Sequence, residues 1–131
     1  MKIKNETIMK PEFKDAIVGL LKRELPVALS LDLITSIDEI NNRNAVIEKQ
    51  KVLLLEKHVK KDANGVFLED KNGPIYKSAE DKVKMEASYL ELGKQTFDIT
   101  LKEKIKVSKS KDRMSAVDIT VLRDEFIEIV D

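Results

Sequence analysis

Two acidic turns are the part of this sequence whose residue types could bind an ion. Residues 62–65 and 70–73 are near-copies of Asp-x-Asn-Gly, eight residues apart. A calcium loop needs oxygen ligands at alternate positions, a Gly at the sharp turn and a distal Glu. In both copies the Gly comes two positions too early, and Val66 occupies the third ligand position of the first copy. Asn-Gly favours tight turns, and Asp side chains bond to the turn backbone. We therefore interpret both boxes as bends of a β-hairpin flap over 62–77.

No other residues have the spacing of a known catalytic or metal site. His58 is the only histidine, and it has no second ligand one helical turn away and no His-Glu-x-x-His pattern. We interpret it as a solvated or helix-end histidine, whose charge the C-terminal helix dipole favours. The absence of Cys excludes disulfides, thiol catalysis and cysteine-ligated zinc. Glycine-rich phosphate loops and nucleophile elbows are absent as well. We expect no enzyme, no cofactor and no metal.

A basic run near the end of the chain is the second candidate for binding. It consists of Lys102, Lys104, Lys106, Lys109, Lys111 and Arg113. The first three would share one strand face and could hold phosphates or an acidic partner. An acidic segment follows over 118–131, and the two blocks could neutralise each other within the fold or between subunits. There is no aromatic interleaving for base stacking, and the formal net charge of +0 lacks the basic excess of nucleic-acid binding domains. Exposed edge-strand lysines, which discourage aggregation, are the simpler interpretation.

The composition is that of a soluble protein rich in helices. The 131 residues fit a single domain over 1–131, and they are 42% hydrophobic, 5% aromatic and 37% charged. Only 4 Gly and 3 Pro favour long, solvent-exposed helices over a β-sandwich. No apolar run approaches the roughly 20 residues that span a bilayer, and the first residues do not resemble a signal peptide. We expect a soluble, cytoplasmic protein that does not bind membranes.

Hydrophobic periodicity predicts where the elements lie. Helices are expected over 9–24, 27–61, 78–92 and 116–130, with one strand, or two short ones, over 96–107. The long helix carries an apolar stripe with a heptad repeat, which consists of Leu33, Ile40, Ile47 and Leu54. Asn44 and Lys51 lie in the neighbouring stripe, where polar residues either fix the register of an oligomer or are simply exposed. A helix of about 50 Å is too long to be covered by the core alone. The 78–92 helix is therefore expected to return antiparallel along it.

These elements predict an α+β fold that is mainly helical. We expect a long antiparallel helical hairpin with the β-hairpin flap at its tip, a small β-sheet and a coiled-coil-like oligomer. Phe67 and Tyr76, two of the six aromatic residues, lie in the flap. There they would be accessible to a partner protein.

Several segments in this order also resemble a known family. The chain opens "MKIKNETI", passes "ELPV" and a long Glu/Lys-rich helix to the turns "KDANG" and "DKNGPIYK", and ends with "FDITL" and "DITVLRDEFIEI". This layout resembles a family of small, functionally uncharacterised proteins encoded by tailed phages and prophages of Gram-positive bacteria. The resemblance covers most of the chain. It implies a phage setting and offers no catalytic residues.

The leading hypothesis is a non-enzymatic protein-interaction module of a phage, such as an accessory of virion or tail assembly, that acts as a homo-oligomer. Its location would be the host cytoplasm or the virion. An inhibitor or modulator that binds a host defence or nucleic-acid enzyme is the alternative. Nucleic-acid binding through the basic run is the third hypothesis.

Overall fold

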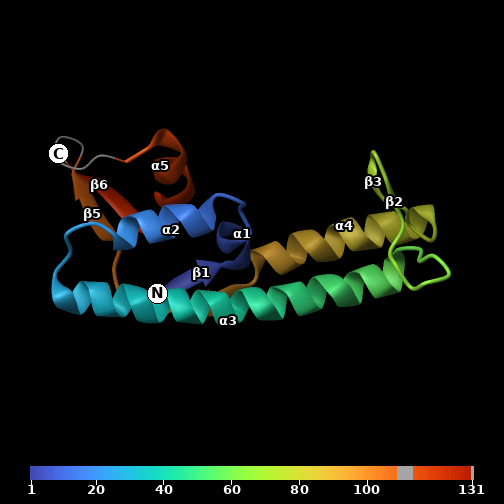
Figure 1. The fold of residues 1–131 in the computed structure, drawn as a ribbon, viewed down its shortest axis with the longest axis horizontal. Helices are drawn as coiled ribbons and strands as arrows, with labels where there is room; N and C mark the ends of the chain where they lie inside the picture. The colour runs from blue at the N-terminus through green and yellow to red at the C-terminus, as the bar shows by residue number, and fades with distance from the viewer. Residues whose placement is uncertain (109–113, 131) are drawn as a thin grey trace.

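The computed structural model of the chain describes residues 1–108 and 114–130. Its fold is α+β and mainly helical, as predicted. The helices are α1 (Asn5–Ile8), α2 (Phe13–Leu21), α3 (Val27–His58), α4 (Ala79–Lys94) and α5 (Ala116–Leu122). The strands are β1 (Lys2–Lys4), β2 (Glu69–Asp70), β3 (Gly73–Pro74), β4 (Thr96–Asp98), β5 (Ile105–Ser108) and β6 (Ile127–Val130). The molecule is elongated, with a thicker end around α2 and α5 and a thinner end that carries β2 and β3 (Figure 1).

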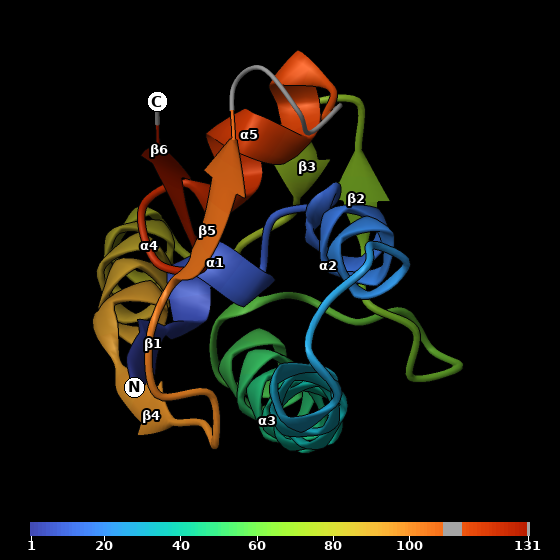
Figure 2. The ribbon, with the colours of Figure 1, turned by 90° about the vertical axis from the view of Figure 1, so that its left-hand side faces the viewer.

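The longest element, α3, connects the two ends of the molecule. Its 32 residues extend about 48 Å at 1.5 Å per residue. Leu33, Ile40 and Ile47 of the heptad stripe are buried, as expected for the inward face of the helix. The return helix α4 runs antiparallel along the second half of α3, while α2 covers the first half (Figures 1 and 2). Ser78 caps α4, because its Oγ accepts a hydrogen bond from the Asp81 amide at 3.1 Å.

The flap at the tip contains both Asp-x-Asn-Gly boxes, and both are turns. In each box a carboxylate oxygen of Asp62 or Asp70 accepts the backbone N–H two residues further on, at 2.8 Å. Gly65 and Gly73 have φ angles of 80° and 111°, which side-chain-bearing residues rarely adopt. The two Asp side chains therefore serve the backbone of the turns.

Backbone hydrogen bonds join three segments of the flap to one another at the end of α3. Lys60 N–H donates to the Ile75 carbonyl at 2.9 Å, Ile75 N–H to Leu68 at 3.0 Å, and Leu68 N–H to Lys60 at 2.8 Å. A β-bridge between Val59 and Tyr76 adds a further connection to the end of the helix. The flap is therefore shaped mainly by its own main chain.

The region predicted as a strand over 96–107 forms two strands with different partners. β4 pairs antiparallel with β1, and β5 pairs in parallel with β6. The predicted helix over 116–130 was wrong in its second half, since α5 ends at Leu122 and 127–130 is a strand. A single strand is not stable in water. The alternating apolar residues of 127–130 form the strand β6, which pairs with β5.

The body holds the hydrophobic core. The Phe13 and Phe126 rings pack with their centroids 5.3 Å apart, and both residues are buried. The core cluster contains no residue between Ile47 and Leu92. We call 48–91 the arm and the remaining described residues the body.

Asn5 fixes the base of the arm to the body. It is fully buried, its Nδ2 donates to the Leu92 carbonyl at 2.8 Å, and its backbone N–H donates to the Gln95 carbonyl at 2.8 Å. Its Oδ1 accepts a hydrogen bond from Arg43 Nε at 2.8 Å. The one side chain therefore links α1 to both helices of the hairpin.

Candidate protein-interaction surfaces

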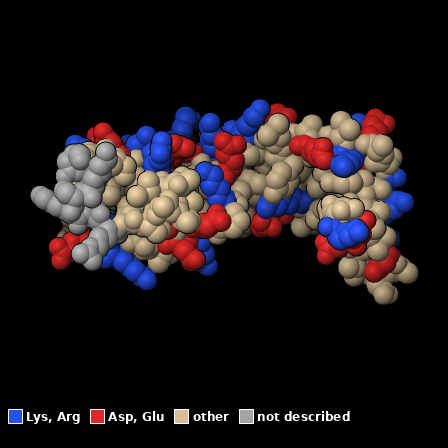
Figure 3. Space-filling view, turned by 90° about the horizontal axis from the view of Figure 1, so that it is seen from above, with Lys and Arg blue, Asp and Glu red and all other residues tan. Residues whose placement is uncertain are grey.

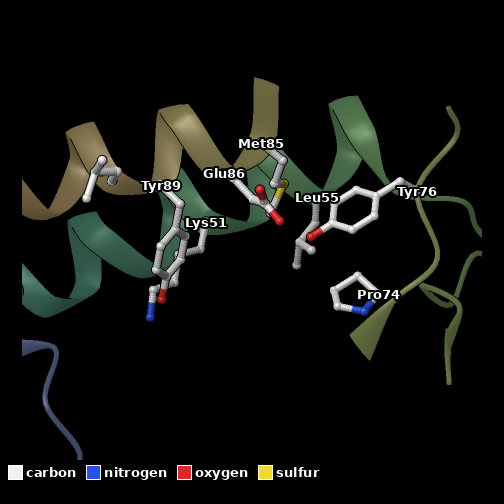
Figure 4. A pocket seen from close by; sticks show the side chains of 8 residues that line it. Lys51, Leu55, Pro74, Tyr76, Met85, Glu86 and Tyr89 are labelled. Atoms are coloured by element: carbon white, nitrogen blue, oxygen red, sulfur yellow. The ribbon is translucent and has the colours of Figure 1, made fainter. Parts of the chain in front are cut away.

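A groove of about 510 Å³ lies on the arm between α3, α4 and the flap (Figure 4). Its lining consists of Lys51, Leu55, Pro74, Tyr76, Met85, Glu86, Tyr89 and Leu90. We call it the arm groove. Tyr89 is 42% exposed and Leu90 59% exposed, so much of this apolar surface is uncovered.

Lys51 supplies a positive charge to the groove. Its Nζ lies 5.7 Å from the centroid of the Tyr89 ring and 3.2 Å from Glu48 Oε1. Partial burial acts to lower the pKa of Lys51, but its hydrogen bonds and electrostatic interactions with Glu48 and Tyr89 outweigh burial. The pKa is therefore raised above its ordinary value, and Lys51 is a cation beside an aromatic face.

A buried histidine supports the flap end of the groove. His58, the last residue of α3, is 3% exposed, and its Nδ1 lies 2.8 Å from Asp81 Oδ1. Ser78 Oγ donates to Asp81 Oδ2 at 2.7 Å. The hydrogen bonds from His58, foremost, and from Ser78 lower the pKa of Asp81. The helix-end position of His58 was predicted correctly, but solvation was wrong, because α4 and the flap pack against the end of α3.

A second uncovered apolar surface lies at the start of α3, in the body. Val27, Leu31 and Ile34 are 76%, 59% and 44% exposed. Their i, i+4, i+7 spacing places them on one face of the helix, and the buried Leu33 belongs to another face. We call these three residues the α3 ridge.

On the face of the molecule that Figure 3 shows, charges of both signs are mixed rather than gathered by sign. Seen from above, Lys and Arg alternate with Asp and Glu around uncharged surface (Figure 3). No one sign of charge therefore dominates this face.

No protein family, curated protein or solved structure matches this chain. Among residues 1–108 and 114–130, no three His, Asp or Glu side chains are grouped so that they could hold a metal ion. No helix in the same residues is long and apolar enough to cross a bilayer. The candidate sites therefore rest on the geometry of this chain.

The lysines of the basic run lie among acidic residues. Lys102, Lys104 and Lys106 line a groove of about 540 Å³ whose lining also contains Glu24, Asp32 and Glu103. Lys106 is also the register partner of Glu128 across β5 and β6. Lys109, Lys111 and Arg113 lie outside the described residues. The described part of the run is therefore not a purely basic face.

The structure brings two of the predicted site residues, Lys51 and Tyr76, together in the arm groove. Phe67 is half-buried elsewhere in the flap, with Lys61 Nζ 4.9 Å from its ring centroid, and Asn44 is half-buried on α3.

Sequence reasoning missed the remaining apolar lining of the groove and the α3 ridge. The ridge had a detectable signal in its i, i+4, i+7 spacing. The groove had none, because its walls come from three separate segments.

Proposed function

We propose that this protein is a non-enzymatic protein-interaction module that self-associates. The observation that carries the proposal is the uncovered apolar surface of a chain that already has a closed core. Six large apolar or aromatic side chains of the arm are at least 42% exposed, namely Val52, Leu53, Val66, Val83, Tyr89 and Leu90. Tyr89 and Leu90 lie together in the arm groove, and contiguous exposed apolar surface of this kind is typical of interaction sites.

The shape of the arm supports the same function. It projects from the body as two helices, and its residues other than His58, Val59 and Met85 are at least partly exposed. Two packed helices leave apolar flanks that a third or fourth helix would normally cover in a bundle. A partner that supplies such an element would complete the packing of the arm.

The phage setting comes from the sequence resemblance. In that setting a self-associating module without catalytic groups suits an accessory role in virion or tail assembly. A host protein that docks on the arm is the alternative occupant. The mixed charge around Lys102, Lys104 and Lys106 gives less support to nucleic-acid binding, which relies on phosphate contacts from a basic face.

Sedimentation velocity over a concentration series from about 1 µM to about 1 mM tests the proposal, because that range covers weak, transient interfaces. We expect the mass to rise with concentration above the 14.9 kDa of one chain. A mass that stays at one chain over the whole series contradicts self-association. If the monomeric protein then captures one host enzyme from a lysate, the host-directed alternative replaces the proposal.

A further inference from the structure

The arm groove contains one charge for which the described residues supply no partner. Two charged residues line the groove, Lys51 and Glu86. Lys51 is already paired, because its Nζ lies 3.2 Å from an oxygen of Glu48, which is not part of the lining. Among the described residues no side chain forms an ion pair or hydrogen bond with the Glu86 carboxylate, although Lys82 lies one helical turn before it. The uncompensated charge of the groove is therefore negative.

Glu86 lies between the two tyrosines of the groove, with its carboxylate on the side of Tyr76 (Figure 4). At the Tyr89 end a cation is already present, because Lys51 Nζ lies 5.7 Å from the centroid of that ring. None of the cation–ring contacts within the described residues involves Tyr76. The face of a tyrosine ring attracts cations. Glu86 and Tyr76 thus offer a carboxylate and an aromatic ring at a place where the described residues put no cation.

The remainder of the groove is apolar and has the size of a small-molecule site. Met85 in its lining is 7% exposed, and Leu55 and Pro74 lie next to Tyr76 (Figure 4). The volume of about 510 Å³ falls within the range of roughly 300–1,000 Å³ that is typical of ligand pockets. Such pockets combine a mostly apolar lining with a few polar groups that orient the ligand. A protein partner of standard size would need roughly 20–30 contact residues on each side, whereas 8 residues line this groove.

The charge of the groove selects among ligand classes. An anionic ligand would be repelled by Glu86, and Glu48 already neutralises the charge of Lys51 that could attract it. A purely apolar ligand would remove water from the Glu86 carboxylate without replacing its hydrogen bonds, which costs free energy. A ligand with a cationic group replaces the lost water contacts with an ion pair. The best fit is therefore a molecule that is both cationic and apolar.

We propose that the arm groove is a binding site for a small organic cation, a molecule with one ammonium or guanidinium group on an apolar or aromatic body. The cationic group lies against Glu86 and the ring of Tyr76, and the body packs on Leu55, Met85 and Pro74. Backbone hydrogen bonds of Ile75 with the segments on either side hold this part of the flap in place before a ligand arrives, so little ordering is needed on binding. This site goes beyond the proposed self-association and does not depend on it.

Three probes that share a phenyl body and differ in charge test the class of ligand. They are phenethylamine, which is a cation at neutral pH, phenethyl alcohol, which is neutral, and phenylacetate, which is an anion. NMR titrations use protein below the onset of association, at about 0.15 M salt, where distant charges are screened. We expect phenethylamine to bind with a Kd of about 1 mM or lower, with shifts centred on 74–76 and 85–90. The alcohol should bind about fivefold more weakly, the scale of a partly exposed ion pair, and phenylacetate more weakly still.

A substitution of Glu86 isolates the contribution of its carboxylate. Glu86 is exposed, so Glu86→Gln leaves the core intact. We expect this variant to bind phenethylamine about fivefold more weakly, at the level of the alcohol, and to bind the alcohol as before. Glu91→Gln removes another exposed carboxylate of α4 that does not line the groove, and this matched control should bind all three probes like the unmodified chain.

A pair of Tyr76 variants tests the aromatic face. Tyr76→Phe keeps the ring, whereas Tyr76→Leu keeps an apolar side chain without a π-face. We expect Tyr76→Leu to bind phenethylamine about threefold more weakly than Tyr76→Phe, because a cation–ring contact at an exposed site contributes about this much. The amide NMR spectrum of each variant confirms that the flap is folded.

Several outcomes would overturn the proposal. Equal binding of the three probes contradicts a cation site, and tighter binding of phenylacetate assigns the dominant charge of the groove to Lys51. Shifts centred outside the groove lining, or no binding of phenethylamine up to about 10 mM, remove the site. Equal losses in Glu86→Gln and Glu91→Gln contradict it as well, because the general charge of the surface would then be responsible. A chain that sediments as a monomer at every concentration removes the proposed self-association instead and leaves these binding results unaffected.

Discussion

The body and the arm contain the same kinds of apolar residues but bury them to different extents. In the body, apolar side chains from α2, α3, α5 and the strands converge on one core, so that Phe13, Leu20 and Phe126 are nearly inaccessible. In the arm, two helices and a flap bury only Val59 and Met85 among the apolar residues. Two packed helices cannot enclose a core, because each has only one neighbour. The difference teaches that the buried apolar core, and with it most of the stability, resides in the body, whereas most apolar side chains of the arm stay accessible.

The largest expected effect comes from breaking the body. Phe126→Ala removes a fully buried ring that packs on Phe13, and we expect it to lower the free energy of unfolding by about 3–5 kcal/mol. Leu53→Ala, on the exposed surface of the arm, should change it by less than about 0.5 kcal/mol. Urea unfolding followed by circular dichroism measures both. Equal effects would mean that the arm carries as much of the stability as the body.

The elements that follow from local patterns were predicted from the sequence. The heptad of Leu33, Ile40 and Ile47 identified α3 and its buried face, Ser78 marked the start of α4, and the Asn-Gly pairs marked the turns. Each of these signals is contained within a few neighbouring residues. That is why a single sequence reveals them.

Features that depend on distant contacts were not predicted. The apolar residues near Phe126 fit the spacing of a helix as well as that of a strand, and the pairing of β6 with β5 decides between them. The arm groove needs Leu55, Pro74 and Leu90 to come together from three segments. For the ridge, the sequence shows the row of Val27, Leu31 and Ile34, but not that the other elements of the fold leave this row uncovered.

The next largest effect concerns the backbone of the flap. Gly73 has a φ of 111°, and nothing lies within 4 Å of an added Cβ, so Gly73→Ala introduces backbone strain without a clash. We expect this strain to destabilise the flap by about 1–3 kcal/mol. Hydrogen exchange should then quicken in 59–77 and stay unchanged in the body.

Gly65 offers a matched comparison, because its φ of 80° is closer to the left-handed region that Asn tolerates. Gly65→Asn should therefore leave exchange of the flap nearly unchanged, while Gly73→Asn should quicken it. Equal sensitivity at the two positions would contradict the strain argument.

A substitution of His58 tests how the flap is held to the two helices of the arm. His58→Ala removes the buried imidazole and its hydrogen bond with Asp81. We expect amide exchange in 59–77 to accelerate on the order of tenfold, the scale of one hydrogen bond, while exchange in α2 and α5 stays the same. Lys57→Ala, at an exposed neighbouring position, is the control. Acceleration throughout the body would show that the arm and the body unfold as one unit.

A smaller, pH-dependent effect follows from Asp81. The folded state lowers the pKa of this carboxyl below its ordinary value of 3.8, so it binds a proton less readily than the unfolded state does. Its contribution to stability is present above that value and is lost as the pH falls through the lowered folded pKa. We expect Asp81→Asn to quicken exchange of the flap at about pH 6, and the difference from the unmodified chain to shrink below about pH 3. A difference that does not change with pH would contradict this account.

The smallest expected effect on folding is at the α3 ridge and the arm groove, the two uncovered apolar surfaces. Leu31→Ser and Leu90→Ser replace side chains that are 59% exposed, so we expect each to change the free energy of unfolding of the monomer by less than about 0.5 kcal/mol. Urea unfolding at a protein concentration below the onset of association measures the free energy of unfolding of the monomer alone. At higher concentration the unmodified chain should gain stability from assembly, because a partner that binds only the folded state shifts the equilibrium, and the variants should not. A large loss already in the dilute monomer would place these leucines in the packing of the chain itself rather than on surfaces kept for a partner.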